Sequence, residues 1–122
     1  MTTSDPEPFP EFVRALPIVD SPLASLRGWM LRTSQAMAMF YEIPDGVDLP
    51  EHAHGAQWGV VLAGSIEFTI GGETRTYARG DTYYVPDSVP HSAVIHPGYV
   101  GIDVFADADR YSAREDSRRR PG

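Results

Sequence analysis

The sequence predicts an all-β fold, either a sandwich or a barrel, in a single domain of 122 residues. Short apolar or alternating segments recur at intervals of about 8–12 residues, which is typical of both architectures. Glycine, proline and aspartate stand between these segments, and these residue types favour tight turns. Apolar residues do not recur at helical spacing over any long stretch, so no substantial amphipathic helix is expected.

Seven strands are expected, and each is bounded by turn residues. They span residues 36–43, 58–63, 65–70, 73–77, 82–85, 91–95 and 99–105. The third, SIEFTI, alternates strictly, which places Ile66, Phe68 and Ile70 on one face. Gly71-Gly72 then predicts a tight hairpin. The segment EFVRAL, residues 11–16, is long enough for one short helical turn.

The packed domain is predicted to cover residues 12–106. Residues 1–11 are expected to form a loose N-terminal arm, because Pro6, Pro8 and Pro10 prevent regular hydrogen bonding. Residues 107–122 are polar and charged and end in an arginine cluster, which indicates a solvated, mobile tail.

Composition excludes several functional classes. The formal charge of −7 argues against nucleic-acid binding, which needs a basic face. No cysteine is present, so any metal must be held by nitrogen and oxygen ligands. No apolar run approaches the roughly 20 residues that cross a membrane. The acidic, proline-rich first residues do not resemble a secretory leader, and a cytoplasmic protein is therefore expected. All ten basic residues are arginine, which indicates a GC-rich genome, and a bacterial protein is expected.

Two histidines one residue apart suggest a metal site. Side chains alternate along a strand, so His52 and His54 share a face and can converge on one ion. Gln57 is three residues further on and joins them only if the chain bends, for which Gly55-Ala56 is a plausible place. Beyond that bend, Gln57 shares a face with Gly59 and Val61. The pair alone is also compatible with a surface loop.

A second histidine segment follows the predicted hairpin. The first segment reads G-VDLPE-HAH-GA-Q-WGVVLA-G over residues 46–64, and the second reads G-DTYYV-P-D-S-VP-H-SAV-I over residues 80–95. In type, spacing and order, these segments resemble the two motifs of the cupin family. The resemblance covers most of residues 36–105 and implies a double-stranded β-helix, or jelly-roll barrel, with a metal inside. The ligands it implies are His52, His54 and His91, with Gln57 at the usual position of a glutamate.

The segments depart from the family pattern at three positions. Gln57 replaces the glutamate after a gap of two residues, where the family has three or four. Ser88 replaces a glycine, and Ile95 replaces an asparagine. Three alternatives remain open: a site of three histidines and Gln57, a site of three histidines alone, or a metal-free barrel in which Gln57 bonds a histidine.

The predicted ligands are neutral, so the charge of a divalent ion would stay uncancelled. Imidazole ligands favour zinc, iron(II), nickel or copper over calcium and magnesium, and manganese is disfavoured without a carboxylate. The uncancelled charge would acidify a bound water or attract an anionic ligand.

Other side chains are candidates for the pocket lining. Met39 and Tyr41 share a face of their strand, and Asp103 is an acid among apolar neighbours. The alternatives are ordinary core positions for Met39 and Tyr41 and a salt bridge for Asp103. Tyr83 and Tyr84 point to opposite faces, so at most one enters the barrel.

Three functions are compatible with these features. The first is a metal-dependent enzyme of the oxygenase, isomerase or lyase type that acts on a small molecule. The second is a non-enzymatic module that binds or senses a small molecule. A storage role is least expected, because the chain is shorter than the two-barrel storage proteins of the family. The apolar segments WGVVLA and YVGIDVF indicate a homodimer.

Overall fold

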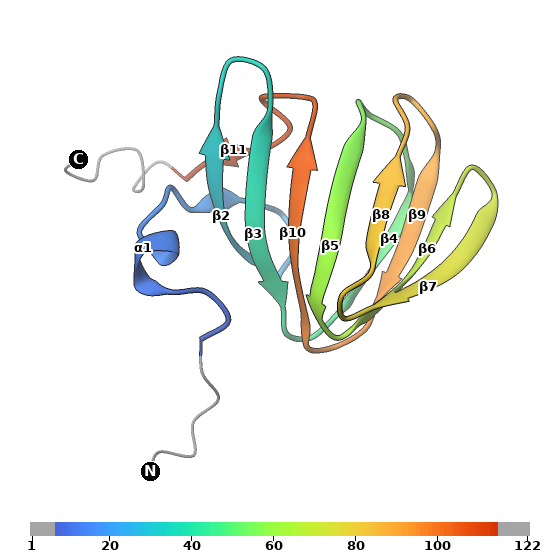
Figure 1. Ribbon diagram of the computed structural model, residues 1–122, viewed down its shortest axis with the longest axis horizontal. Coiled ribbons are helices and arrows are strands. Elements are labelled where there is room, and N and C mark those ends of the chain that lie inside the picture. Colours follow the sequence, from blue (N-terminus) through green and yellow to red (C-terminus); the bar gives the residue numbers. More distant parts are fainter. Residues whose placement is uncertain (1–6, 115–122) are drawn as a thin grey trace, which may run out of the picture.

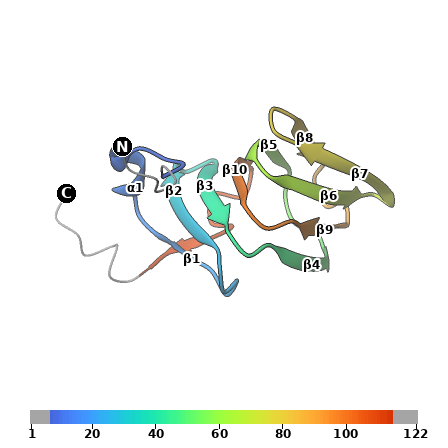
Figure 2. The same ribbon diagram turned by 90° about the horizontal axis from the view of Figure 1, so that it is seen from below.

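The computed structural model describes residues 7–114, which form two facing antiparallel sheets and a third, two-stranded sheet (Figure 1). The larger sheet has the order β2-β3-β10-β5-β8 and the smaller the order β4-β9-β6-β7. Figure 2 shows the four strands of the smaller sheet next to one another in that order. The elements are α1 (Glu11–Arg14), β1 (Val19–Asp20), β2 (Arg27–Arg32), β3 (Met37–Ile43), β4 (Val47–His52), β5 (Gln57–Ala63), β6 (Ser65–Ile70), β7 (Glu73–Ala78), β8 (Thr82–Val85), β9 (His91–Ile95), β10 (Tyr99–Phe105) and β11 (Ser112–Ala113).

The all-β jelly-roll prediction is confirmed. All seven expected strands are present, with bounds that shift by at most one residue. The short helix α1 lies within the segment predicted for a helical turn. β1, β2 and β11 were not predicted. The strand expected to carry His52 and His54 is β4, but it ends at His52 and leaves His54 beyond it; β4 contains Pro50 and lies at an edge of the smaller sheet. An edge position tolerates proline, because one side of the strand needs no ladder hydrogen bond.

The core lies between the two sheets and follows the alternation of the strands. Gln57, Gly59 and Val61 are buried on the inner face of β5, as predicted, whereas Trp58 and Leu62 are exposed. The buried apolar side chains pack into one cluster. Its members are Val19, Met30, Met37, Met39, Tyr41, Ile43, Val61, Ile66, Phe68, Tyr83, Val85, Ala93, Ile95, Tyr99 and Phe105.

Parts of both expected mobile ends contact the domain. Phe9 is buried, with its ring centroid 6.0 Å from that of Trp29 and 5.9 Å from that of Phe40. At the other end, β11 pairs with β1. Residues 1–6 and 115–122 lie outside the described part of the chain, so the domain boundaries remain a prediction. Within residues 7–114, no helix is long and apolar enough to cross a membrane.

Candidate metal centre

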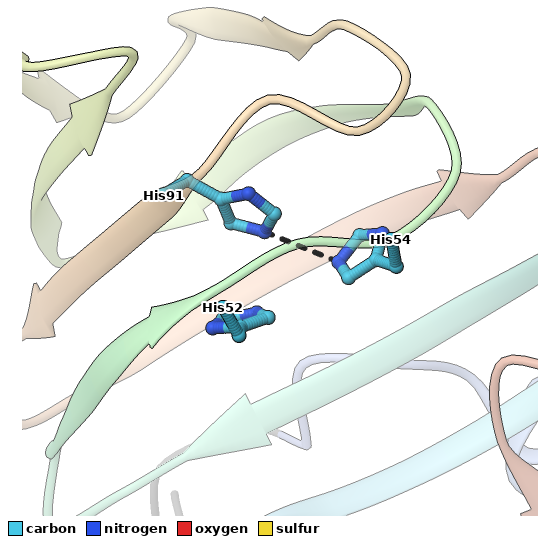
Figure 3. A group of neighbouring side chains, drawn as sticks. All are labelled: His52, His54 and His91. Carbon is cyan, nitrogen blue, oxygen red and sulfur yellow. Dashed lines mark hydrogen bonds between the residues drawn. The ribbon is translucent and has the colours of Figure 1, made fainter.

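Three histidine rings gather where β4 meets β9 (Figure 3). His52 ends β4 and His91 begins β9, and the two are direct partners in the sheet register. His54 lies two residues beyond β4, where the chain leaves the smaller sheet for β5. One ring nitrogen from each histidine lies within 4.8 Å of the others. The structure thus brings together the three histidines that the sequence singles out.

Backbone carbonyls orient all three rings. Each ring places its Nδ1 within hydrogen-bond distance of a nearby carbonyl oxygen. The partners are Pro50 at 2.8 Å for His52, Gly55 at 2.7 Å for His54 and Val89 at 2.9 Å for His91. A carbonyl only accepts, so the proton belongs on Nδ1 in each ring. This tautomer leaves Nε2 of each ring with a free lone pair, which is the state that binds a metal.

The Nε2 atoms of His54 and His91 lie 3.1 Å apart. Burial lowers the pKa of both rings below the ordinary 6.5, and the positive charge of Arg110 acts in the same direction. Neutral rings with Nδ1 protonated have no proton to share, so two lone pairs face each other. Bonds of about 2.0–2.1 Å at a tetrahedral zinc ion separate two nitrogens by roughly 3.3 Å. The histidines therefore fit a divalent transition metal.

The loop that carries His91 also braces His54. The backbone N–H of Ser88 donates to the carbonyl oxygen of His54 at 2.8 Å. Ser88 has φ 63°, in the left-handed region that favours glycine, and no other non-glycine residue among 7–114 has a positive φ. This is the position where the cupin motif has glycine. The backbone conformation of the motif is thus retained even though the residue is serine.

Gln57 is buried and reaches the site from the opposite sheet. Its Nε2 donates to Oδ2 of Asp103 at 2.9 Å, and not to a histidine. Because the amide nitrogen faces the carboxylate, the carbonyl oxygen Oε1 is the Gln57 atom left to approach a metal.

Asp103 is the centre of a buried polar network. Its Oδ2 also accepts from the Tyr41 hydroxyl at 3.0 Å, and its Oδ1 accepts from the Tyr83 hydroxyl. Burial raises the pKa of Asp103 to about 6, although these hydrogen bonds oppose the shift. Burial and the charge of Asp103 also raise the pKa of Tyr41 and Tyr83 well above 10. Asp103 lies within β10 and forms no salt bridge with another residue of 7–114, so the buried position and not an ion pair sets its surroundings.

Gly59 makes room for this network. In the register of the larger sheet it lies between Asp103 on β10 and Tyr83 on β8. A Cβ atom at Gly59 would lie 2.0 Å from Oδ1 of Asp103 and 2.6 Å from the Tyr83 ring. The missing side chain therefore lets the two flanking side chains meet above the strand. Tyr84 points outward and is exposed, so only Tyr83 enters the barrel, as predicted.

The histidines and Asp103 line one cavity inside the barrel. Centres of water-sized molecules can occupy about 50 Å³ of it, which is room for a few waters. Met39 and Tyr41 lie in its wall, as does Phe105. A second hollow of about 450 Å³ adjoins it at His52 and His54 and opens to the surface. A small ligand can therefore approach the histidines from outside.

Arg110 and Tyr111 line both hollows, and the sequence did not identify them. The Arg110 guanidinium lies 4.5 Å from the Tyr111 ring centroid and 5.8 Å from that of Phe105. The Nε atom of Arg110 is buried and has no hydrogen-bond partner. Within residues 7–114, the only other buried side-chain nitrogen or oxygen without a partner is Oε2 of Glu42. Both residues fall in the segment expected to form a mobile tail. The aromatic ring of Tyr111 was the one signal that this segment packs.

A family model described as "Cupin domain" matches residues 39–98, which include all three histidines. Over 61 residues, the chain is 26% identical to a mannose-1-phosphate guanylyltransferase of Salmonella montevideo, a match that covers 50% of this chain and 13% of that protein. The chain thus spans only a small part of that relative.

Two solved structures are similar over most of their length. An RmlC-like cupin from Shewanella frigidimarina has 28% identity and a TM-score of 0.67, with 95% of this chain and 98% of that chain covered. KdgF from a Halomonas species has 25% identity and a TM-score of 0.63, with 80% of this chain and 88% of that chain covered.

Proposed function

Since this chain is a small cupin-domain protein, we propose that it binds a divalent transition metal through His52, His54 and His91 and acts on a small anionic molecule. One observation supports the proposal above all. The Nε2 atoms of His54 and His91 lie 3.1 Å apart, while the Nδ1 of each ring is hydrogen-bonded to a backbone carbonyl oxygen. Zinc, iron(II), nickel and copper accept such a nitrogen set, and Gln57 Oε1 is the candidate fourth ligand.

The charges around the cavity favour an anionic ligand. Three neutral imidazoles do not cancel the charge of a divalent ion, and the Arg110 guanidinium adds positive charge beside the same cavity. Its buried Nε lacks a partner, and a guanidinium pairs well with a carboxylate. A small carboxylate therefore fits this site better than a neutral molecule.

Asp103 is the candidate group for proton transfer. A carboxyl with a pKa of about 6 exchanges a proton readily near neutral pH, which suits a general acid or base. Tyr41 and Tyr83 hold the carboxylate through their hydroxyl groups. When bound, the metal would polarise a ligand oxygen or acidify a water. Proton transfer by a buried carboxyl fits an isomerase or lyase better than an oxygenase.

The experiment separates metal binding from turnover. Elemental analysis of the purified protein, with His54→Ala and His91→Ala as comparisons, measures the bound metal. Small carboxylates such as pyruvate and 2-oxoglutarate are then incubated with the protein in D₂O and followed by NMR. Deuterium incorporation that Asp103→Asn abolishes supports an isomerase or lyase. A protein that holds no metal and takes up none, yet folds normally, contradicts the proposal.

The second candidate is a non-enzymatic module that binds or senses a small molecule. The narrow cavity favours it, because about 50 Å³ of free space restricts both ligand and reaction geometry. This alternative predicts thermal stabilisation by one of the carboxylates without deuterium incorporation or product. The same set of incubations therefore distinguishes the two candidates.

We also propose a homodimer formed through the outer face of the larger sheet. One register row crosses all five strands through residues that are apolar or aromatic: Leu31, Ala38, Val104, Trp58 and Tyr84. Four of them are exposed large side chains, with exposed fractions from 36% at Val104 to 59% at Tyr84. A continuous apolar row is more costly in water than scattered single residues, and a second copy would cover it.

A further inference from the structure

The segment that follows β10 is attached to the loop that carries His54. The backbone N–H of Ala106 donates to the carbonyl oxygen of Ala56 at 2.8 Å. One residue further, Oδ2 of Asp107 accepts from the backbone N–H of Gly55 at 2.8 Å. These two bonds connect segments about 50 positions apart in the sequence, so a distant part of the chain holds the bend between β4 and β5.

The contact between Asp107 and Gly55 is close and specific. A Cβ atom at Gly55 would lie 2.5 Å from Oδ1 and 2.8 Å from Oδ2 of Asp107. Only glycine leaves space for the carboxylate at this distance, because real Cβ atoms do not approach oxygen so closely. Glycine is thus needed at position 55 because Asp107 occupies the space of a side chain. The backbone of Gly55 is not in the left-handed region, so its conformation does not require glycine.

Gly55 in turn orients the ring of His54. Its carbonyl oxygen accepts from Nδ1 of His54 at 2.7 Å, the shortest of the three contacts that orient the histidines. Asp107 therefore accepts the hydrogen bond of the Gly55 N–H, and the Gly55 carbonyl oxygen in turn orients the His54 ring. His54 has no strand around it to do this, since β4 ends at His52 and β5 begins at Gln57.

We propose that Asp107 is a positioning residue that holds Gly55 so that His54 keeps its proton on Nδ1 and presents Nε2 to His91. The inference rests on the proposed metal binding for its consequence, which is higher metal affinity. Groups beyond the ligands that orient a metal-binding histidine commonly change the affinity by about 10- to 100-fold when they are removed.

Three variants test the role of Asp107. Asp107→Ala removes the acceptor, whereas Asp107→Asn keeps an acceptor oxygen and removes the charge. Asp81→Ala is the matched control, because Oδ2 of Asp81 accepts from the backbone N–H of Ala78 at 2.9 Å in a turn without histidines. The readouts are zinc affinity by calorimetry on metal-free protein, ¹⁵N chemical shifts of the His54 ring, and hydrogen exchange of the Gly55 amide.

Asp107→Ala is expected to weaken zinc binding about 10- to 100-fold, to expose the Gly55 amide to exchange, and to mix the tautomers of His54. Asp107→Asn is expected to stay within a few-fold of the wild type, and Asp81→Ala to leave all three readouts unchanged. A wild-type tautomer and wild-type affinity in Asp107→Ala overturn the inference, as does an equal loss in Asp81→Ala. If the wild type binds none of zinc, iron(II), nickel and copper, the proposed function fails, and the tautomer in metal-free protein still decides the role of Asp107.

Discussion

The rings of His54 and His91 meet at Nε2, 3.1 Å apart, while the Nδ1 of each contacts a carbonyl oxygen. In a neutral pair with this tautomer, neither Nε2 has a proton to donate to the other. The arrangement is therefore unfavourable unless a cation lies between the rings, either a proton or a metal. Burial lowers the pKa of both rings, which disfavours the proton and leaves the metal as the better partner.

The first prediction concerns the pH dependence of metal binding. His54 and His91 have a pKa below 6.5, so both are neutral at pH 7.5 and zinc displaces no proton from them. As the pH falls towards the lowered pKa values of these rings, protons compete for the same Nε2 atoms and the affinity decreases. Calorimetry in two buffers of different ionisation enthalpy measures the protons released. Substantial release from these rings at pH 7.5 would contradict the lowered pKa values.

The second prediction concerns Asp103 and stability. Its pKa rises from 3.8 to about 6 on folding, so the folded state binds more protons than the unfolded state between these values. The free energy of unfolding therefore falls as the pH rises from about 4 to 6, by about 3 kcal/mol at most. Asp103→Asn should lose this dependence in urea unfolding at pH 4 and pH 7. Asp109→Asn, an exposed change, should keep it.

The third prediction concerns the strained turn at Ser88. A side chain at φ 63° costs about 1–2 kcal/mol, and glycine avoids this cost but loses more backbone entropy on folding. Ser88→Gly is therefore expected to raise the free energy of unfolding by about 0.5–1 kcal/mol. Ser88→Ala separates the loss of the hydroxyl from the release of strain. Equal stability changes in the glycine and alanine variants would exclude strain as the cause.

The fourth prediction concerns the apolar row on the larger sheet. A charge at Tyr84 or Trp58 would lie in the proposed interface, where it lacks water and a partner. Tyr84→Glu is expected to shift the protein from dimer to monomer in sedimentation at micromolar concentration. Val94→Glu is the control, since Val94 has an exposed fraction of 39% on β9 of the other sheet. A monomeric wild type would reject the dimer outright.

The alternation of the strands was sufficient to predict much of the barrel. Gln57, Gly59 and Val61 share the inner face of β5 because period-two alternation persists after the bend at Gly55. β2 was missed because its outer face is not polar: Trp29 is covered by Phe9, so the segment RGWMLR shows no alternation. Covering by a distant segment is a tertiary effect that a local pattern does not contain.

The sequence predicted the three histidines of the candidate site but not the residues that surround them. The resemblance to the cupin motifs placed His52, His54 and His91 together, and the order of the motifs and the strand pairing are regular enough for this to hold. Arg110 and Tyr111 were assigned to a mobile tail because their order depends on long-range contacts. Examples are the bond from Nη2 of Arg32 to the carbonyl oxygen of Tyr111 at 2.6 Å and the contact of the Tyr111 N–H with the sulfur of Met37.

The two tryptophans lie in opposite surroundings. Trp29 is buried under Phe9, whereas Trp58 belongs to the apolar row and has an exposed fraction of 44%. The protein therefore contains two tryptophan fluorophores, and in a single copy only one of them is exposed to water. Acrylamide should spare Trp29 in every state, and it should quench Trp58 in the monomer but not in the proposed dimer, so that unlabelled tryptophan fluorescence reports whether the outer face is covered.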